Sequence, residues 1–470
     1  MTELWAHTAT ELAAMIAAGD VSSREVVDAH LDRIDAVNPR LNAIVRRLDE
    51  SARVAALAAD AAVAAGDALG PLHGVPVTVK ENIDLVGSPT TQGVVAMAEA
   101  LPPLDAPVTE RMKAAGAIPI GRTNLPDFGL RVHTDSSLHG LTRNPHHHDR
   151  TTGGSSGGEA AAIASGMSPL GLGNDIGGSL RNPAHCCGIA SIKPSVGVVP
   201  NASSLPPEDP TLAFQQMAVQ GPMARGVANV RAAFEVLAGP HRRDPVSLPV
   251  QLDGLADGER VRVAVLAEPP GGETHPEIAA AVRSAADVLA NAGHDVVEIA
   301  PPGYEETIDW WAALLVQDTS VMRPLLDGVM GDDAKQVLGS LIDNTPEITL
   351  DMSVMLQGGR HQAMRTWIEF FGEHQIILSP TWALPAFEHG DDLDSDPNAT
   401  ESLIRNTLRP VIPPNFLGLP AAVVPHGTAD GLPVGIQVIG ERFSDLRCLD
   451  VAAQLEAATG TPAPIDPVWS

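Results

Sequence analysis

Short apolar runs that alternate with helical stretches constrain the fold of this chain more than any other feature. VRVAVLAE at 261–268 has the pattern of a buried strand, 276–292 that of a helix, and DVVEIA at 295–300 that of a second strand. Strand–helix–strand units of this kind build α/β sheets. The same pattern predicts four more strands, one ending near Lys80 and three at 117–121, 376–381 and 433–440.

Residues 8–65 are predicted to be helical. Apolar residues recur at helical spacing after Thr10, and Gly19 ends this first helix. Ser22 or Ser23 is suited to cap the second helix. We interpret the region of about 1–65 as outer helical packing. Further helices are expected at 107–115, 159–165 and 445–458, whereas the Pro- and Asp-rich stretch 386–400 is predicted to be a loop.

Composition and charge limit the class of partner. The chain has 470 residues, 44% of them hydrophobic, which is enough to bury a large core, and we favour one domain over 1–470. With 30 basic and 58 acidic residues the net charge is −28, so nucleic acid and anionic membranes would be repelled. A neutral or cationic small molecule fits better. The start of the chain has neither a basic, apolar signal segment nor a membrane anchor, and a cytoplasmic location is expected.

Lysine is scarce, which draws attention to the few that occur. The chain contains only Lys80, Lys113, Lys193 and Lys335. Lys80 ends an apolar run, and burial there would disfavour the ammonium form and leave an amine able to act as a base near neutral pH. A strand-end lysine that reaches solvent is the ordinary alternative for this residue taken alone.

Two clusters of glycine and serine follow, GGSSGG at 153–158 and DIGGSLRNPA at 175–184. Glycines let consecutive backbone N–H groups point toward one spot and form an anion-binding site. Such a site around Ser179 is suited to a developing oxyanion. Taken singly, each cluster is also compatible with a flexible turn, or with a phosphate cradle, although the Gly-Lys-Ser/Thr of phosphate loops is missing. Together with Lys80 they offer a serine nucleophile the base, the relay and the oxyanion hole that it needs.

These motifs resemble the amidase signature family. The resemblance rests on Lys80 and on TTGGSSGGEAAAIASGMSPLGLGNDIGGSLRNPAHCCGIASIKPSVG, inside a signature core of about 70–200, and extends to GRTNLPDF, TRNP and PNFLGLPAAVVPHGTADGLPVGIQVIG. It implies a large twisted mixed β-sheet covered by helices on both faces. It also implies a Ser–cis-Ser–Lys triad, here Ser179, Ser155 and Lys80, with a cis peptide at Gly154–Ser155.

The resemblance further implies roles for the residues around the triad. Ser156, Asp175 and Arg181 occupy positions that hold the triad and the glycine loop by hydrogen bonds. Gly129 stands where relatives often carry a larger pocket residue, which predicts a roomier acyl site. The oxyanion is expected to be bound by the backbone N–H groups of Ile176, Gly177, Gly178 and Ser179.

Substrate choice is expected in the variable segments of about 125–140 and 303–375. Trp310, Trp311 and Trp367 in the second segment either line an apolar pocket or pack in the core. The triplet His146–His148 lacks metal-ligand spacing, and no cofactor or metal is expected. Cys186 and Cys187 are expected to pack behind the nucleophile loop as small buried groups.

The predicted function is hydrolysis of a C–N acyl bond in a small, apolar amide, carbamate or ureido compound through an acyl-enzyme on Ser179. One alternative is the glutaminase subunit of a tRNA-dependent amidotransferase, which shares the triad. A remote alternative is an inactive binding protein on the same fold. The resemblance is also compatible with a homodimer.

Overall fold

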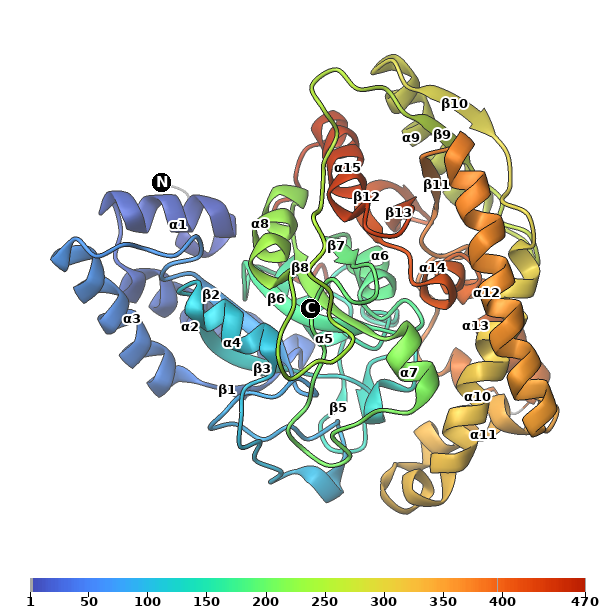
Figure 1. Ribbon diagram of the computed structural model, residues 1–470. Coiled ribbons are helices and arrows are strands. Elements are labelled where there is room, and N and C mark those ends of the chain that lie inside the picture. Colours follow the sequence, from blue (N-terminus) through green and yellow to red (C-terminus); the bar gives the residue numbers. More distant parts are fainter. Residues whose placement is uncertain (1–2, 395, 470) are drawn as a thin grey trace.

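A mixed sheet of eleven strands runs through the part of the chain that the computed structural model describes, residues 3–394 and 396–469 (Figure 1). Its strands are, in spatial order, β1 (Ile44–Arg47), β3 (Ile118–Thr123), β2 (Pro76–Lys80), β6 (Leu170–Asp175), β8 (Val219–Ala224), β7 (Ala190–Lys193), β12 (Ala421–Ala429), β13 (Leu432–Gly440), β11 (Ile376–Pro380), β9 (Arg262–Val265) and β10 (Asp295–Glu298). Strands β3, β2 and β6 are parallel, as are β11, β9 and β10, and the middle of the sheet from β6 to β11 is antiparallel.

Helices cover both faces of this sheet. One face packs against α1 (Ala9–Ala18), α4 (Pro107–Ala114), α8 (Val227–Leu237), α9 (Pro276–Asn291) and α15 (Asp445–Thr459). The opposite face packs against α5 (Gly157–Ala164), α6 (Arg181–Cys187), α7 (Leu212–Met217), α10 (Tyr304–Val329), α12 (Leu350–Glu373) and α14 (Ile412–Leu417).

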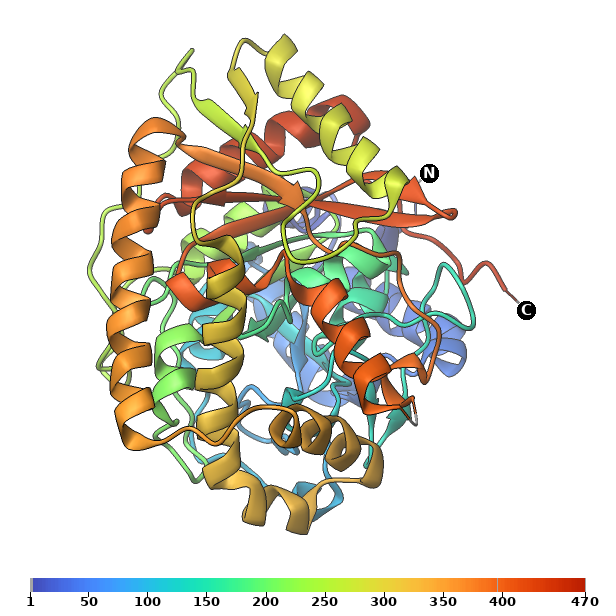
Figure 2. The same ribbon diagram turned by 90° about the vertical axis from the view of Figure 1, so that its right-hand side faces the viewer.

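The remaining elements lie around the edges of the sheet. Helices α2 (Ser23–Leu41) and α3 (Asp49–Ala65) pack beside β3, while α11 (Asp332–Asp343) and α13 (Pro397–Leu408) join α10 and α12 in the helical layer that faces the viewer in Figure 2. Strands β4 (Asp135–Ser136) and β5 (Gly140–Leu141) form a small separate ladder. Short 3₁₀ turns complete the structure: η1 (Leu4–Ala6), η2 (Val95–Met97), η3 (Asp127–Gly129) and η4 (Asp391–Leu393).

Alternation along β2 places Lys80 on the face that carries α5 and α6. Val77 and Val79 enter the core shared with α4 and α8. Thr78 and Lys80 are also fully buried, but successive side chains of a strand point to opposite faces. Lys80 therefore points toward the helices that follow the two glycine and serine clusters.

The N-terminal region is not entirely helical, contrary to the prediction for about 1–65. Thr8 rather than Thr10 caps α1, with a capping box to Glu11, and Ser22 caps α2. Ile44–Arg47 forms β1, which pairs antiparallel with β3. An edge strand of four residues is specified by its partner rather than by a long local pattern, which explains why the sequence alone missed it.

The predicted loop 386–400 is also wrong in part. η4 and the start of α13 lie within it, and Asp396 caps α13 by accepting a hydrogen bond from the Asn398 N–H. Asp followed by Pro at the first helical position is a helix-start signal. The strands predicted at 261–268, 295–300, 376–381 and 433–440 are confirmed, although the first two are shorter than predicted.

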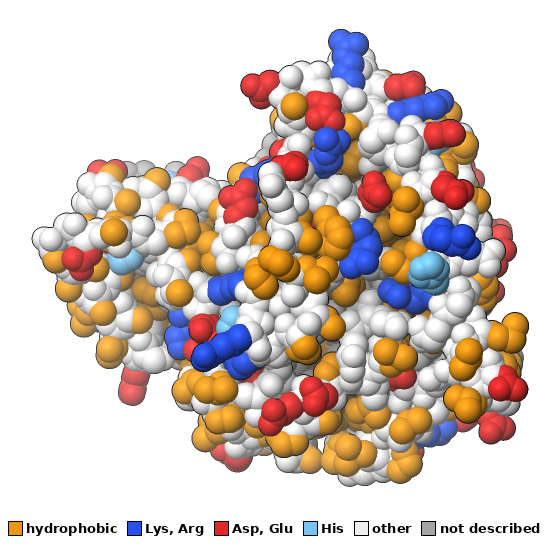
Figure 3. Space-filling view, viewed as in Figure 1, with side chains coloured by type: hydrophobic (Ala, Val, Ile, Leu, Met, Phe, Trp, Pro, Cys, Tyr) orange, Lys and Arg blue, Asp and Glu red, His pale blue; other side chains and the backbone are white. Residues whose placement is uncertain are grey.

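The surface shows no single charged patch on the face drawn in Figure 3, where acidic side chains are scattered among basic and apolar ones. Within residues 3–394 and 396–469, no helix combines the length and apolar character that crossing a membrane requires.

Candidate active site

The structure brings Lys80 and Ser155 into direct contact. Lys80 Nζ lies 2.8 Å from Ser155 Oγ, and the two side chains are 0% and 2% exposed. Ser155 lies just before the start of α5, while Lys80 is the last residue of β2. The strand end and the turn before the helix thus place an amine against a hydroxyl inside the protein.

The environment of Lys80 favours its neutral form. Burial lowers the pKa of Lys80 to about 7, against smaller opposing effects of the Asp175 and Glu159 carboxyl groups. Among the described residues no carboxylate forms an ion pair with Lys80; its second contact is the amide oxygen of Asn174, at 2.6 Å. A neutral amine next to a serine hydroxyl is able to accept its proton.

Ser179 lies beside the Ser155 turn. Its carbonyl oxygen accepts a hydrogen bond from the Ser156 N–H at 3.3 Å, which joins the two glycine and serine clusters. The Gly154–Ser155 peptide is cis, as expected from the sequence. Ser179 is 7% exposed, more than Lys80 or Ser155, so it is the member of the set that is nearest to solvent.

Among the described residues, three N–H groups in the loop that ends at Ser179 have no hydrogen-bond acceptor. Within the described part of the chain, nothing accepts a hydrogen bond from the N–H of Ile176, Gly177 or Ser179. The Gly178 N–H differs from the expectation, because it donates to Asp175 Oδ1 at 2.8 Å. Gly178 has φ +92°, a conformation that glycine adopts more readily than other residues.

Asp175 and Arg181 hold the ends of this loop. Arg181 donates to both oxygens of Asp175 at 3.0 and 3.1 Å, and both side chains are fully buried. Burial alone would raise the pKa of Asp175, but the charge and hydrogen bonds of Arg181, with the charge of Lys193 and the hydrogen bond from Asn415, together lower it to about 2. Asn415 donates to Asp175 and accepts from Arg181, so α14 anchors the pair.

Gly129 and Ser156 both lie next to Ser155. A Cβ on Gly129 would lie 3.1 Å from Ser155 Oγ, so the first variable segment borders Ser155. Gly129 has φ +68°. Ser156 Oγ lies 3.5 Å from the carbonyl oxygen of Asn174, at the C-terminal end of β6.

Two residues in contact with this site were missed by sequence reasoning. Asn174 contacts Lys80, but a single asparagine before Asp175 carries no pattern of its own. Trp311 donates from Nε1 to the carbonyl oxygen of Ile176 at 2.9 Å. The sequence predicts only a pocket or core position for this tryptophan, because 135 residues separate it from Ile176.

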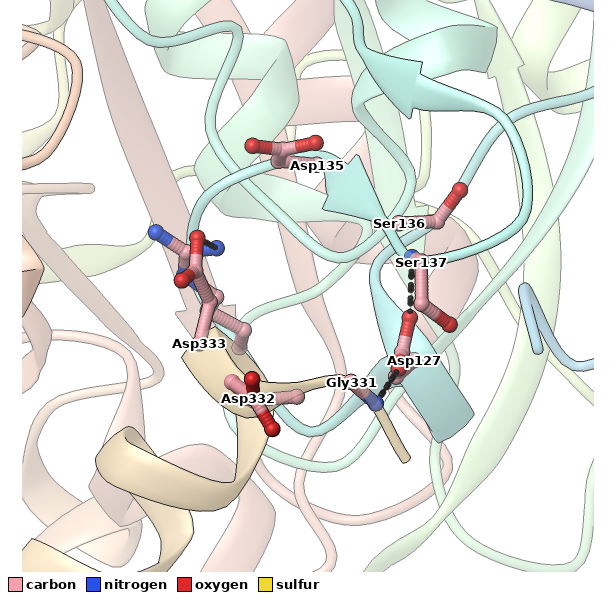
Figure 4. A pocket seen from close by; sticks show the side chains of 9 residues that line it. Asp127, Asp135, Ser136, Ser137, Gly331, Asp332 and Asp333 are labelled. Atoms are coloured by element: carbon pink, nitrogen blue, oxygen red, sulfur yellow. Dashed lines mark hydrogen bonds and ion pairs between the residues drawn. The ribbon is translucent and has the colours of Figure 1, made fainter. Parts of the chain in front are cut away.

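The loop that contains Gly129 also borders a small acidic hollow of about 120 Å³ (Figure 4). Asp127 accepts hydrogen bonds from the N–H groups of Ser137 and Gly331, and Arg131 pairs with buried Asp392. These contacts join the loop to Ser137, to the start of α11 and to η4. The hollow is lined by Asp127, Arg131, Asp135, Ser136, Ser137, Gly331, Asp332, Asp333 and Ala334.

The histidine triplet and the cysteines take structural positions. His146 Nε2 lies 3.0 Å from the carbonyl oxygen of Cys187, and His148 pairs with Asp149. Cys186 and Cys187 are buried in α6, behind the Ser179 loop, as expected. Residues 3–394 and 396–469 contain no group of three or more His, Cys, Asp or Glu side chains arranged to hold a metal ion.

Comparisons with known proteins agree with this arrangement. The amidase family model matches residues 25–449. An indoleacetamide hydrolase from Bradyrhizobium diazoefficiens is 41% identical over 98% of this chain and 88% of its own length. A glutamyl-tRNA(Gln) amidotransferase subunit from Salinispora arenicola is 35% identical over 99% of both chains. A crystal structure of a bacterial aryl acylamidase superposes with a TM-score of 0.84, at 29% identity and 97% coverage of both chains.

The fold, the site and these relatives define a class of enzyme: hydrolases that act on carbon–nitrogen bonds other than peptide bonds. The large mixed sheet with helices on both faces, expected from the sequence, is confirmed by the structure and its neighbours. The chain belongs to the amidase signature family.

Proposed function

We propose that this enzyme hydrolyses the amide bond of a small, apolar substrate through an acyl-enzyme on Ser179, with Ser155 as proton relay and Lys80 as base. The observation that carries the proposal is the contact between buried Lys80 Nζ and Ser155 Oγ at 2.8 Å. A buried amine with a pKa of about 7 is a base at neutral pH, which an ordinary surface lysine is not.

In the first half of the reaction Lys80 accepts the Ser155 hydroxyl proton while Ser155 accepts that of Ser179. The Ser179 oxygen attacks the carbonyl carbon, and the tetrahedral intermediate forms. When the C–N bond breaks, the departing nitrogen takes a proton from Ser155, which Lys80 reprotonates. Water then loses a proton to the same pair, attacks the acyl ester, and releases the carboxylic acid and Ser179.

We assign the oxyanion to the free N–H groups of Ile176, Gly177 and Ser179. Donors of this kind stabilise the negative oxygen of the intermediate more than the carbonyl of the substrate, and losing one typically raises the barrier by about 3–4 kcal/mol. Asp175, Arg181 and Gly178 hold the loop in shape and do not contact the oxyanion.

The substrate class follows from what borders Ser155 and the Ser179 loop. Val132 and Ile176 pack against the apolar cluster of α10, α12 and α14, to which Trp311 belongs. Gly129 leaves room beside Ser155. These features and the likeness to an indoleacetamide hydrolase favour arylalkyl and aryl amides, and carbamates and ureido compounds present the same kind of carbonyl.

Release of ammonia from glutamine for a tRNA-dependent amidotransferase is the second candidate. The observation that favours it is 35% identity over 99% of both chains with the glutamyl-tRNA(Gln) amidotransferase subunit from Salinispora arenicola. The net charge of −28 opposes docking of tRNA, because phosphate contacts require basic side chains.

The first experiment is intact mass after incubation with a fluorophosphonate, which phosphonylates activated serines. Wild type should gain one adduct and Ser179→Ala none. Lys80→Arg should be nearly unreactive, because a guanidinium keeps its proton. Absence of an adduct on folded wild-type protein would instead support a binding protein on this fold.

Substrate class is then tested on a panel of indole-3-acetamide, an anilide, a phenyl carbamate and glutamine. We expect the aromatic amides to be hydrolysed with the highest kcat/KM. Hydrolysis of glutamine alone would establish the second candidate in place of the first.

A further inference from the structure

Asn174 is in direct contact with the base but has no role in the mechanism above. Lys80 Nζ donates to Asn174 Oδ1 at 2.6 Å, which is shorter than its 2.8 Å contact with Ser155 Oγ. Asn174 lies near the end of β6, next to Asp175, and is not among the residues whose roles the family motif implies.

The chemistry of a neutral amine makes this second contact important. A neutral lysine amine has two N–H bonds and one lone pair, and only the lone pair accepts a proton. An amide oxygen is an acceptor, so it takes one of the N–H bonds. With that N–H held by Asn174, the lone pair of Lys80 is free to face the hydroxyl of Ser155.

A second asparagine supports the orientation of the Asn174 amide. Asn174 Nδ2 donates to Asn82 Oδ1 at 2.9 Å, so the oxygen of Asn174 rather than its NH₂ faces Lys80. A reversed amide would present N–H groups to the amine and would have no acceptor for it. Asn82 comes from the loop after β2, and its Nδ2 lies 3.8 Å from the position of a Cβ on Gly129.

Asn174 also supplies an acceptor without a full charge. The carboxyl groups that act on Lys80 are Asp175 from β6, which Arg181 neutralises, and Glu159 from α5, whose carboxyl oxygen accepts a hydrogen bond from Thr78. Arg122 from β3 donates to the backbone carbonyl oxygen of Lys80 and not to its side chain. A carboxylate in place of the Asn174 amide would stabilise the ammonium form and remove the base at neutral pH.

We propose that Asn174 is a positioning residue for Lys80: its amide oxygen binds one N–H of the neutral amine and thereby aims the lone pair at Ser155. This inference rests on the proposed function of Lys80 as the base. It assigns the asparagine pair Asn82 and Asn174 to the catalytic apparatus.

The test is the pH dependence of the rate at which a fluorophosphonate labels Ser179, since it requires no known substrate. Wild type should show an acid limb near pH 7. Asn174→Asp should move that limb upward by about 1–3 pH units, because a carboxylate at 2.6 Å favours the ammonium. At pH 7 its labelling should be about 5- to 500-fold slower, and at pH 10 it should be within about twofold of the wild-type rate.

Two further variants separate positioning from a merely structural role. Asn174→Leu should lower the labelling rate about tenfold or more at every pH without moving the acid limb upward. Asn344→Asp makes the same chemical change at the exposed end of α11 and should behave as wild type.

An acid limb of Asn174→Asp at the wild-type pH, in a variant whose circular dichroism and unfolding match wild type, would overturn the inference and leave the proposed function standing. Wild-type protein that is not labelled at Ser179, or whose labelling survives Lys80→Arg, would overturn the proposed function and this inference with it.

Discussion

The indole N–H of Trp311 donates a hydrogen bond to the carbonyl oxygen of Ile176 at 2.9 Å. That carbonyl belongs to the peptide whose N–H is the Gly177 donor, and a peptide unit is planar and trans, so its C=O and N–H point in opposite directions. Trp311 therefore sets the direction of the Gly177 N–H, one of the donors that we propose for the oxyanion. Helix α10, which lies in the second variable segment, thus orients the Ile176–Gly177 peptide in the loop that ends at Ser179.

Trp311→Phe is expected to lower kcat about 10- to 100-fold with little change in KM, since the lost contact acts on the intermediate more than on the substrate. The phenyl ring lacks the Cζ2 and Cη2 atoms that lie nearest Gly177, so the variant also loses packing on that residue. Trp310→Phe is the matched control, because its ring packs on Phe416 and not on the loop. Steady-state kinetics on the best amide of the panel measures both, and equal losses in the two variants would contradict the role of Trp311.

Gly129→Ala is expected to reduce kcat/KM about 100-fold, because the new methyl group would lie 3.1 Å from Ser155 Oγ and displace it. The positive φ of Gly129 adds about 1 kcal/mol of backbone strain. Gly140→Ala is the control: φ is +74°, and nothing lies within 4 Å of the added Cβ. Urea unfolding should show similar losses of stability in both variants, while amide hydrolysis should fall only in the first.

Arg181→Met is expected to lower the free energy of unfolding by about 3–5 kcal/mol at pH 7, because it leaves Asp175 as an unpaired buried charge. The exposed pair of Arg323 and Asp343 offers the control, and Arg323→Met should cost less than about 1 kcal/mol.

The loss in Arg181→Met should also depend on pH. The folded pKa of Asp175 is about 2, below its unfolded value of 3.8, so the stability that this carboxylate contributes is present above about pH 4 and lost as the pH falls through 2. Urea unfolding at pH 7 and pH 3 should therefore show a smaller difference between variant and wild type at pH 3. A difference that does not depend on pH would show that packing, not the ion pair, causes the loss.

The features that were predicted correctly from the sequence are those that a short, contiguous run of residues determines. Lys80 at a strand end and the two glycine and serine clusters are contiguous motifs, and the structure brings Lys80 and Ser155 into contact as the motif implies. The strands at 376–381 and 433–440 are apolar runs bounded by turn residues, and both are present. Gly129 was found through its place in the family pattern.

What the sequence missed depends on contacts between distant segments. β1 exists because it pairs with β3, and Trp311 reaches Ile176 across 135 residues. Asn174 acts through the direction of one amide oxygen, which Asn82 fixes from 92 residues away. The Gly178 N–H was assigned to the oxyanion because a run of glycines does not reveal which of its N–H groups a neighbouring carboxylate takes.

Glu159 has a buried carboxyl group that takes no part in the proposed mechanism. It lies in the first turn of α5, accepts a hydrogen bond from Thr78 at 2.5 Å, and is fully buried. Burial raises the pKa of Glu159 to about 8, against the hydrogen bond from Thr78. The folded protein therefore keeps a proton on Glu159 that the unfolded chain, with a value of 4.5, has lost.

Between pH 4.5 and 8 the folded state binds more protons at this position than the unfolded state, so Glu159 lowers stability progressively as the pH rises through that window. Glu159→Gln is a neutral mimic of the protonated acid and removes this loss. Urea unfolding at pH 5, 6.5 and 8 should show a free-energy difference between variant and wild type that grows in favour of the variant. Glu235→Gln, at an exposed position on α8, should show a difference that stays constant. A constant difference for Glu159→Gln as well would mean that Glu159 is ionised in the folded enzyme, and that a negative charge lies permanently beneath Lys80.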